Sequence, residues 1–198
     1  MFTVGITGGI ATGKSLATDF FAAKGIDIID ADKISRRLQE PGQAGYEAIV
    51  KKFGVAVLSK DKTIIRSELR NLAFSNNETK KWLEDLMHPM IGKKVLEGFE
   101  KVKSKWAIYS APLWSEKNKF DRIMVIDAPQ AQQIERIIKR DKSSAELAGQ
   151  IVDQQLHRNQ RAGFADDFLM NDSTIESFER KLDFYFNLYN RLADAPKN

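Results

Sequence analysis

The strongest constraint on this chain comes from residues 8–15, Gly-Gly-Ile-Ala-Thr-Gly-Lys-Ser, which fit the pattern Gly-x4-Gly-Lys-Ser/Thr. This pattern is typical of loops that bind the phosphates of a nucleotide. Gly8 and Gly13 allow the backbone to curl tightly and to turn several N–H groups toward an anion. Lys14 can reach the β- and γ-phosphates, and the Ser15 hydroxyl can hold Mg²⁺. The sequence therefore predicts a nucleotide-binding loop.

The flanks of this loop fit the same chemistry. Residues 2–7 are apolar and β-branched, as in a buried parallel strand, and residues 16–24 are helix-like with a stop at Gly25. A helix that begins near Gly13 would aim the positive end of its dipole at the phosphates. The alternative is a glycine-rich turn without a ligand, which the order of strand, loop and helix disfavours.

Length and composition exclude several classes of protein. A chain of 198 residues fits one domain, or one core with insertions. No apolar run is long enough to span a membrane, and no signal segment precedes the loop, so we expect a cytoplasmic protein without a membrane partner. The absence of cysteine excludes a disulfide framework, thiolate zinc sites and cysteine nucleophiles.

The charge pattern predicts no nucleic-acid partner. The net charge is +4, but basic and acidic residues are mixed along the helices, and no nucleic-acid-binding module is recognisable. The pairs Lys51-Lys52 and Lys80-Lys81 are expected on solvated helix faces. The alternative for these pairs is that they attract a polyphosphate substrate.

Two carboxylates follow the second predicted strand. Residues 26–29 are Ile-Asp-Ile-Ile, and Asp30-Ala31-Asp32 comes directly after them. Ligands of open parallel sheets bind outside the carboxyl ends of the strands, so a carboxylate here could accept a proton from a hydroxyl or orient Mg²⁺. The alternative is that an aspartate caps the next helix. For Asp30 the two interpretations are even, whereas for Asp32 we favour catalysis.

Short apolar strands recur later in the chain and alternate with helices. This alternation predicts an α/β fold with a parallel sheet flanked by helices. The further strands are expected at residues 105–112, 122–129 and 166–171.

The helical segments have different expected roles. Residues 33–104 have a helical pattern that is broken at His88-Pro89, and they are long for a crossover, so they form a packing subdomain, an acceptor-binding insertion or both. Residues 130–139 and 145–161 are polar helices with arginines at the hinge, which resemble a lid that excludes water from phosphoryl transfer. Residues 174–194 form an amphipathic helix whose apolar stripe is expected in the core.

Two rival functions are weaker. Asn118-Lys119-Phe120-Asp121 matches a guanine-binding signature, but it precedes a strand rather than following one, and no Asp-x-x-Gly is present for a GTPase switch. The second rival is a module that binds a nucleotide without catalysis. Asp32 and the lid-like arginines argue against that second alternative.

A series of short motifs in chain order identifies a family. The pieces are Gly5-Ile6-Thr7-Gly8-Gly9-Ile10, Gly13-Lys14-Ser15, Asp30-Ala31-Asp32-Lys33-Ile34, Glu40-Pro41-Gly42-Gln43, Phe53-Gly54, Arg66, Leu69, Phe74, His88-Pro89-Met90-Ile91, Pro112-Leu113, Glu116, Phe120-Asp121-Arg122, Glu135-Arg136, Arg140-Asp141, Gln155, Arg158, Arg161, Ala165-Asp166 and Asn171. Single pieces are weak, but the ordered series is specific. Over nearly its full length the chain resembles the dephospho-coenzyme A kinases, a family of P-loop kinases.

The resemblance implies transfer of the γ-phosphoryl of ATP to the ribose 3′-hydroxyl of dephospho-coenzyme A, giving coenzyme A and ADP. Asp32 would be the base, Lys14 and Arg140 would stabilise the transferring phosphoryl, and Mg²⁺ would be held by Ser15 and Asp32. His88 would contact the acceptor, although a packed helix-end histidine is the alternative. The runner-up function is another small-molecule or nucleoside monophosphate kinase of this fold.

The implied contacts fall into two sets. The nucleotide would be bound by Gly9, Ala11, Thr12, Gly13, Lys14, Ser15, Leu16, Arg140 and Asn171. The acceptor would be bound by Asp32, His88, Pro112, Leu113 and Arg161.

We expect the chain to be organised as a single P-loop kinase domain and to be a monomer or a weak homo-oligomer. Its core would comprise residues 1–32, 105–135 and 163–198, with a helical acceptor-binding insertion at 33–104 and a lid at 136–162.

Three departures from the family pattern stand out. Ala11-Thr12 replaces the usual Gly-Ser, and Ala11 restricts the backbone if this position needs a positive φ. Trp114-Ser115 replaces an aliphatic and aromatic pair, and Met170 stands where Asp is usual. None of these removes a phosphate, metal or base residue, so we expect an active enzyme.

Overall fold

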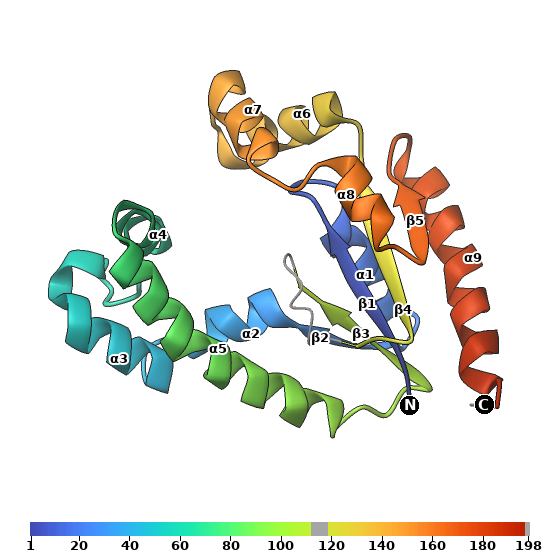
Figure 1. Ribbon diagram of the computed structural model, residues 1–198, viewed down its shortest axis with the longest axis horizontal. Helices are drawn as coiled ribbons and strands as arrows, with labels where there is room; N and C mark the ends of the chain where they lie inside the picture. Colours follow the sequence, from blue (N-terminus) through green and yellow to red (C-terminus); the bar gives the residue numbers. More distant parts are fainter. Residues whose placement is uncertain (112–118, 197–198) are drawn as a thin grey trace. The chain divides into compact units, whose positions relative to one another are not determined.

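The computed structural model describes residues 1–111 and 119–196. The chain divides into two compact units (Figure 1). Unit 1 contains residues 1–29 and 102–198, and unit 2 contains residues 30–101. The predicted single domain, with its insertion and lid bounds, stays a prediction. Within the described residues, no helix is both long enough and apolar enough to cross a membrane.

A sheet with the strand order β2-β3-β1-β4-β5 forms the centre of unit 1 among the described residues. Its pairs β1–β3, β1–β4 and β4–β5 are parallel, which confirms the predicted α/β fold. The inner strands are buried almost throughout, as in a parallel sheet covered on both faces. The strands are β1 (Phe2–Gly8), β2 (Asp27–Asp30), β3 (Trp106–Ser110), β4 (Arg122–Asp127) and β5 (Asp167–Met170).

The core of unit 1 centres on Trp106 of β3, which is fully buried. Its ring makes edge-to-face contacts with Phe21 and Tyr189, at centroid distances of 5.6 and 5.3 Å. These rings come from α1 (Lys14–Ala23) and α9 (Ile175–Asp194), so the apolar stripe of the last helix does lie in the core. Tyr189 Oη also donates to Asp167 at 2.7 Å, and burial raises the pKa of this phenol.

Three helices lie near the carboxyl ends of the strands. Figure 1 shows α6 (Gln130–Asp141) and α7 (Ala145–Asp153) at the end of the sheet where β1 passes into its loop. A separate short helix, α8 (Arg158–Gly163), follows. The prediction of one continuous helix over residues 145–161 was wrong. The backbone leaves the helix after Asp153, and α8 begins anew with a capping box between His157 and Gln160.

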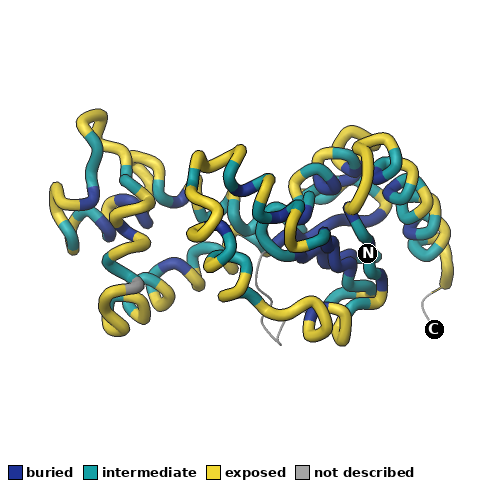
Figure 2. Tube along the Cα trace, turned by 90° about the horizontal axis from the view of Figure 1, so that it is seen from above, coloured by how far each residue is buried: buried dark blue, intermediate teal, exposed yellow. Residues whose placement is uncertain are grey.

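Unit 2 is helical. It contains α2 (Ala31–Leu38), α3 (Ala44–Phe53), a short 3₁₀ helix η1 (Gly54–Val57), α4 (Arg66–Ser75) and α5 (Asn77–Phe99). Its buried apolar cluster is small and consists of Leu38, Ile49, Val57, Leu69 and Met87. Buried positions in the helices of this unit are scattered, whereas the inner strands of unit 1 are buried almost throughout (Figure 2).

The predicted break at His88-Pro89 was also wrong. α5 runs from Asn77 to Phe99 with Pro89 inside it. Proline removes one helical hydrogen bond and costs about 3 kcal/mol. Met87 is buried, and residues on both sides of Pro89, including Leu86 and Met90, pack against the cluster of unit 2. This packing outweighs the local penalty, so the helix continues.

Candidate active site

The phosphate loop connects β1 to α1, as the sequence predicts. A Cβ atom added at Gly8 would overlap the carbonyl oxygen of Ile126 on the neighbouring strand, so only glycine fits there. Gly13 has a φ of 107°, and an added Cβ would also overlap the amide nitrogen of Asn171. The buried Thr12 closes the loop by donating its hydroxyl to Gly9 O at 2.9 Å. Both glycines of the motif are therefore required by this geometry.

Ala11 occupies the left-handed region with a φ of 57°. Ala11 stands where the family usually has glycine, and the backbone of the phosphate loop has a positive φ at this position. For an L-residue other than glycine, this conformation costs roughly 1–2 kcal/mol. Other contacts must therefore hold the loop in place.

Three side chains from distant parts of the chain bond the backbone of three consecutive loop residues. Ile10 N–H donates to Gln155 Oε1 at 2.8 Å. Arg136 Nη1 donates to Ala11 O at 3.1 Å, and Asn171 Nδ2 donates to Thr12 O at 2.8 Å. Asn171 was predicted to bind the nucleotide, and the structure places it directly against the loop. Gln155 and Arg136 were recognised as positions of the family pattern, but no contact with the phosphate loop was predicted for them.

The first turn of α1 carries Lys14, Ser15 and Leu16. Lys14 Nζ donates to Ser110 Oγ at 3.3 Å. Ser110 is buried at the carboxyl end of β3, beside β1. The Ser15 side chain is exposed, and Leu16 packs partly against the core of unit 1. Ser110 was not predicted as a site residue, although its place near the end of a predicted strand was a usable signal.

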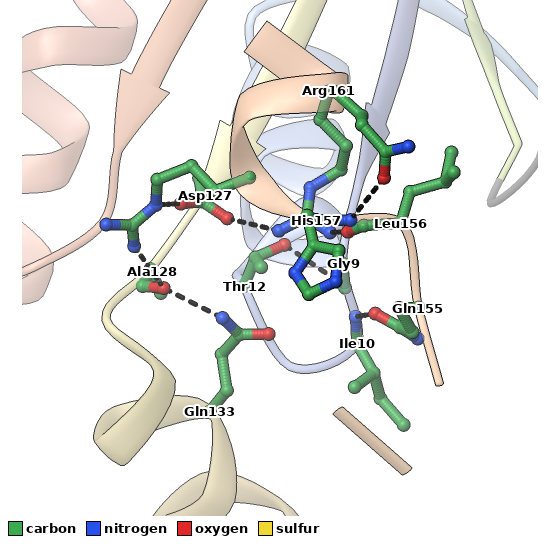
Figure 3. A network of polar contacts seen from close by, with 12 residues as sticks. Gly9, Ile10, Thr12, Asp127, Ala128, Gln133, Gln155, Leu156, His157 and Arg161 are labelled. Carbon is green, nitrogen blue, oxygen red and sulfur yellow. Dashed lines mark hydrogen bonds and ion pairs between the residues drawn. The ribbon is translucent and has the colours of Figure 1, made fainter. Parts of the chain in front are cut away.

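Asp127 is a buried acid at the end of β4, and its carboxylate accepts hydrogen bonds from two arginines of α8 (Figure 3). Its Oδ1 accepts from Arg161 Nη2 at 2.8 Å, and its Oδ2 accepts from Arg158 Nε. Two further donors converge on the carbonyl oxygen of Ala128, from Arg158 at 3.0 Å and from Gln133 at 2.8 Å. No role was predicted for Asp127. Its place as an acid near the carboxyl end of the strand predicted at residues 122–129 was a usable signal.

The two arginines predicted to bind ligands have partners within unit 1. Arg161 is buried and, besides Asp127, bonds the carbonyl oxygen of Leu156. Arg140 is exposed near the end of α6 and forms two hydrogen bonds with Asp141, at 2.7 and 2.8 Å, which raise the pKa of its guanidinium. The roles assigned to both arginines stay predictions.

The remaining predicted residues lie in unit 2 or outside the described residues. Asp30 Oδ1 accepts from Lys33 N–H at 3.0 Å, so Asp30 caps α2, while Asp32 lies half-buried in the first turn of that helix. His88 is exposed in the middle of α5, which does not fit the alternative of a packed helix-end histidine. Pro112 and Leu113, predicted to bind the acceptor, lie outside the described residues.

Carboxylate, imidazole and thiolate groups do not gather into a protein-only metal site anywhere in residues 1–111 and 119–196. A magnesium ion that accompanies a nucleotide usually needs only one or two protein oxygens, because phosphates and water supply the rest. The exposed hydroxyl of Ser15, at the end of the phosphate loop, fits that type of site.

The parallel sheet and the phosphate loop between β1 and α1, with Lys14 beside Ser110, define a P-loop nucleotide-binding protein. The chain also matches the model of the dephospho-CoA kinase family over residues 2–177. It is 40% identical over 179 residues to the dephospho-CoA kinase of Coxiella burnetii, covering 88% of this chain and 90% of that protein. The chain belongs to the dephospho-CoA kinase family.

Solved structures agree with this assignment. The crystal structure of TT1252 from Thermus thermophilus has a TM-score of 0.80 and 25% identity, covering 94% of this chain and 97% of that one. Dephospho-CoA kinase from Campylobacter jejuni has a TM-score of 0.62 and 28% identity, covering 94% and 96%.

Proposed function

We propose that this protein transfers the γ-phosphoryl group of ATP to the ribose 3′-hydroxyl of dephospho-coenzyme A, giving coenzyme A and ADP. The observation that carries this proposal is the phosphate loop held between β1 and α1 in a chain that belongs to this family. The protein would act in the cytoplasm on a small-molecule substrate, as a monomer or a weak homo-oligomer.

The nucleotide would be held mainly by the loop. N–H groups at the start of α1 would bind its phosphates, because that end of the helix is positive. Lys14 would counter charge on the transferring phosphoryl, with Arg140 as a second cation. Mg²⁺, held by Ser15 and Asp32, would neutralise charge on the β- and γ-phosphates when bound. The nucleotide contacts proposed in full are Gly9, Ala11, Thr12, Gly13, Lys14, Ser15, Leu16, Arg140 and Asn171.

Asp32 would accept the proton from the 3′-hydroxyl. Its place in the first turn of α2 is separate from the cap, since Asp30 already satisfies the N–H of Lys33. The capping alternative therefore belongs to Asp30, and the assignment of Asp32 as the base is supported by the family to which the chain belongs. The acceptor would contact Asp32, His88, Pro112, Leu113 and Arg161.

The test is ADP release with ATP and Mg²⁺, measured with and without dephospho-coenzyme A. Wild type should show turnover that depends on this acceptor. Asp32→Asn should reduce that turnover at least ~100-fold, the low end of general-base contributions. Asp30→Asn is the matched control, because asparagine is an equally good cap, and it should leave turnover nearly unchanged.

The other outcomes are equally informative. If Asp32→Asn keeps its turnover, the kinase activity stands but Asp32 only positions the acceptor. If ATP binds but dephospho-coenzyme A gives no turnover, the assignment fails. A screen of gluconate, shikimate and nucleoside monophosphates as acceptors would then test the runner-up function.

A further inference from the structure

The connection between α7 and α8 contacts the phosphate loop through the side chain of Gln155. Gln155 lies in this connection, and its Oε1 accepts the Ile10 N–H at 2.8 Å (Figure 3). A Cβ added at Gly9 would lie only 3.0 Å from the same oxygen. Gln155 therefore packs directly on the loop and fixes the Gly9–Ile10 peptide, one residue before Ala11.

This connection is itself anchored to the sheet. Arg158 and Arg161, which follow it on α8, both bond the buried carboxylate of Asp127. Asp127 ends β4, the strand that pairs with β1. Gln155 is thus tied through α8 to the strand next to the one from which the phosphate loop emerges. A charge-assisted anchor of this kind gives the glutamine a defined position.

The peptide that Gln155 holds lies one residue before the strained residue of the loop. Ala11 has a φ of 57°, a conformation that alanine rarely adopts on its own. Bonds on both sides counter this preference, since Ile10 N–H donates to Gln155 and Thr12 O accepts from Asn171, while Ala11 O itself accepts from Arg136. A loop with glycine at this position would need such support less, because glycine adopts positive φ readily.

We propose that Gln155 is a positioning residue for nucleotide binding, which keeps the phosphate loop in the Ala11 left-handed conformation before the nucleotide arrives. It touches the loop backbone rather than the reacting atoms, and it links the loop to the α7–α8 connection. The proposal rests on the proposed function for its nucleotide, but the loop conformation is measurable without any ligand.

The first experiment is hydrogen exchange of residues 9–13 in the ligand-free protein. Gln155→Leu keeps the size of the side chain but removes the acceptor, so exchange of these amides should rise roughly tenfold, as expected for loss of one hydrogen bond. Gln154→Leu is the matched control, since this exposed neighbour lies on the same connection. Unchanged exchange in Gln155→Leu would overturn the proposal, whether or not the protein phosphorylates dephospho-coenzyme A.

The second experiment separates positioning from a merely structural role. Gln155→Leu should weaken MgADP binding and raise KM for ATP by about tenfold, with kcat and KM for dephospho-coenzyme A changed much less. Adding Ala11→Gly to this variant should recover part of the lost affinity, because glycine relieves the conformational demand. Equal losses with and without the Ala11→Gly substitution, or a fall in kcat alone, would contradict the proposal. Absent turnover in wild type would defeat the proposed function but not the exchange result.

Discussion

Unit 1 and unit 2 stabilise their predicted site residues in different ways. In unit 1 the phosphate loop rests on a continuous core around Trp106, and distant side chains bond its backbone. In unit 2, Asp32 and His88 lie on helices that share a small cluster, and one of these helices contains Pro89. The nucleotide loop is therefore built for preorganisation, whereas the unit proposed to hold the acceptor has less buried surface to resist adjustment.

The largest effect should come from matched tryptophan substitutions, one in each unit. Trp106→Ala removes a fully buried ring and should lower the free energy of unfolding by about 3–5 kcal/mol. Trp82→Ala removes a half-buried ring that contacts Phe53 edge to face, and should cost about 1–2 kcal/mol. Urea unfolding measures both values. Equal losses would show that the two cores do not differ as described.

Pro89→Ala should act in the opposite direction on unit 2. The substitution restores the N–H that the middle of α5 lacks, so we expect the free energy of unfolding to rise by about 1–3 kcal/mol. Hydrogen exchange of residues 82–95 should slow in parallel. A loss of stability would mean that the proline supplies packing that the buried cluster of unit 2 requires.

A pH effect is expected at the start of β2. Asp27 accepts from the backbone N–H groups of Ser104 and Lys103, which lower the pKa of its carboxyl. A lowered folded-state pKa gives stability that is present above the ordinary carboxyl pKa and is lost as the pH falls from there through the lowered folded-state pKa. Asp27→Asn should cost about 1 kcal/mol at neutral pH and less under acid conditions. Thermal melts between about pH 3 and 7 would reveal the converging curves, and parallel curves would refute this assignment.

The smallest effect concerns the strained residue of the phosphate loop. Ala11→Gly relieves a φ of 57° but adds freedom to the unfolded chain, and the two terms are each about 1 kcal/mol. Their difference should change the free energy of unfolding by less than about 0.5 kcal/mol. Differential scanning calorimetry would measure it. A loss above about 1 kcal/mol would show that alanine is not strained in this loop.

Local patterns predicted the parts of the fold that local chemistry determines. The strand, loop and helix around Lys14 were recognisable because their residues are contiguous. The sequence left two roles open for Asp30, catalysis and helix capping. The hydrogen bond that it accepts from Lys33 N–H shows that Asp30 caps α2. Proline normally ends a helix, so continuation through Pro89 could be seen only from the packing around it.

The contacts that complete the phosphate loop were beyond such reasoning. Ile10 and Gln155 are separated by 145 positions, and Thr12 and Asn171 by 159. No periodicity links residues so far apart. The resemblance to a family named Gln155 and Asn171 as matching positions, but their bonds to the loop depend on where α8 and β5 lie in unit 1. The bonds of Asp127 also depend on the position of α8. The predicted helix over residues 145–161 had joined α8 to α7.

The position of the three loop contacts in the chain has a consequence for biosynthesis. The phosphate loop leaves the ribosome before Arg136, Gln155 and Asn171, which follow the loop residues that they bond by 125, 145 and 159 positions. Residues 30–101 make a cluster of their own and need not wait for these later residues. A nascent chain can therefore complete unit 2 while its nucleotide loop is still unsupported. Tight nucleotide binding would then mark a chain whose synthesis has passed Asn171.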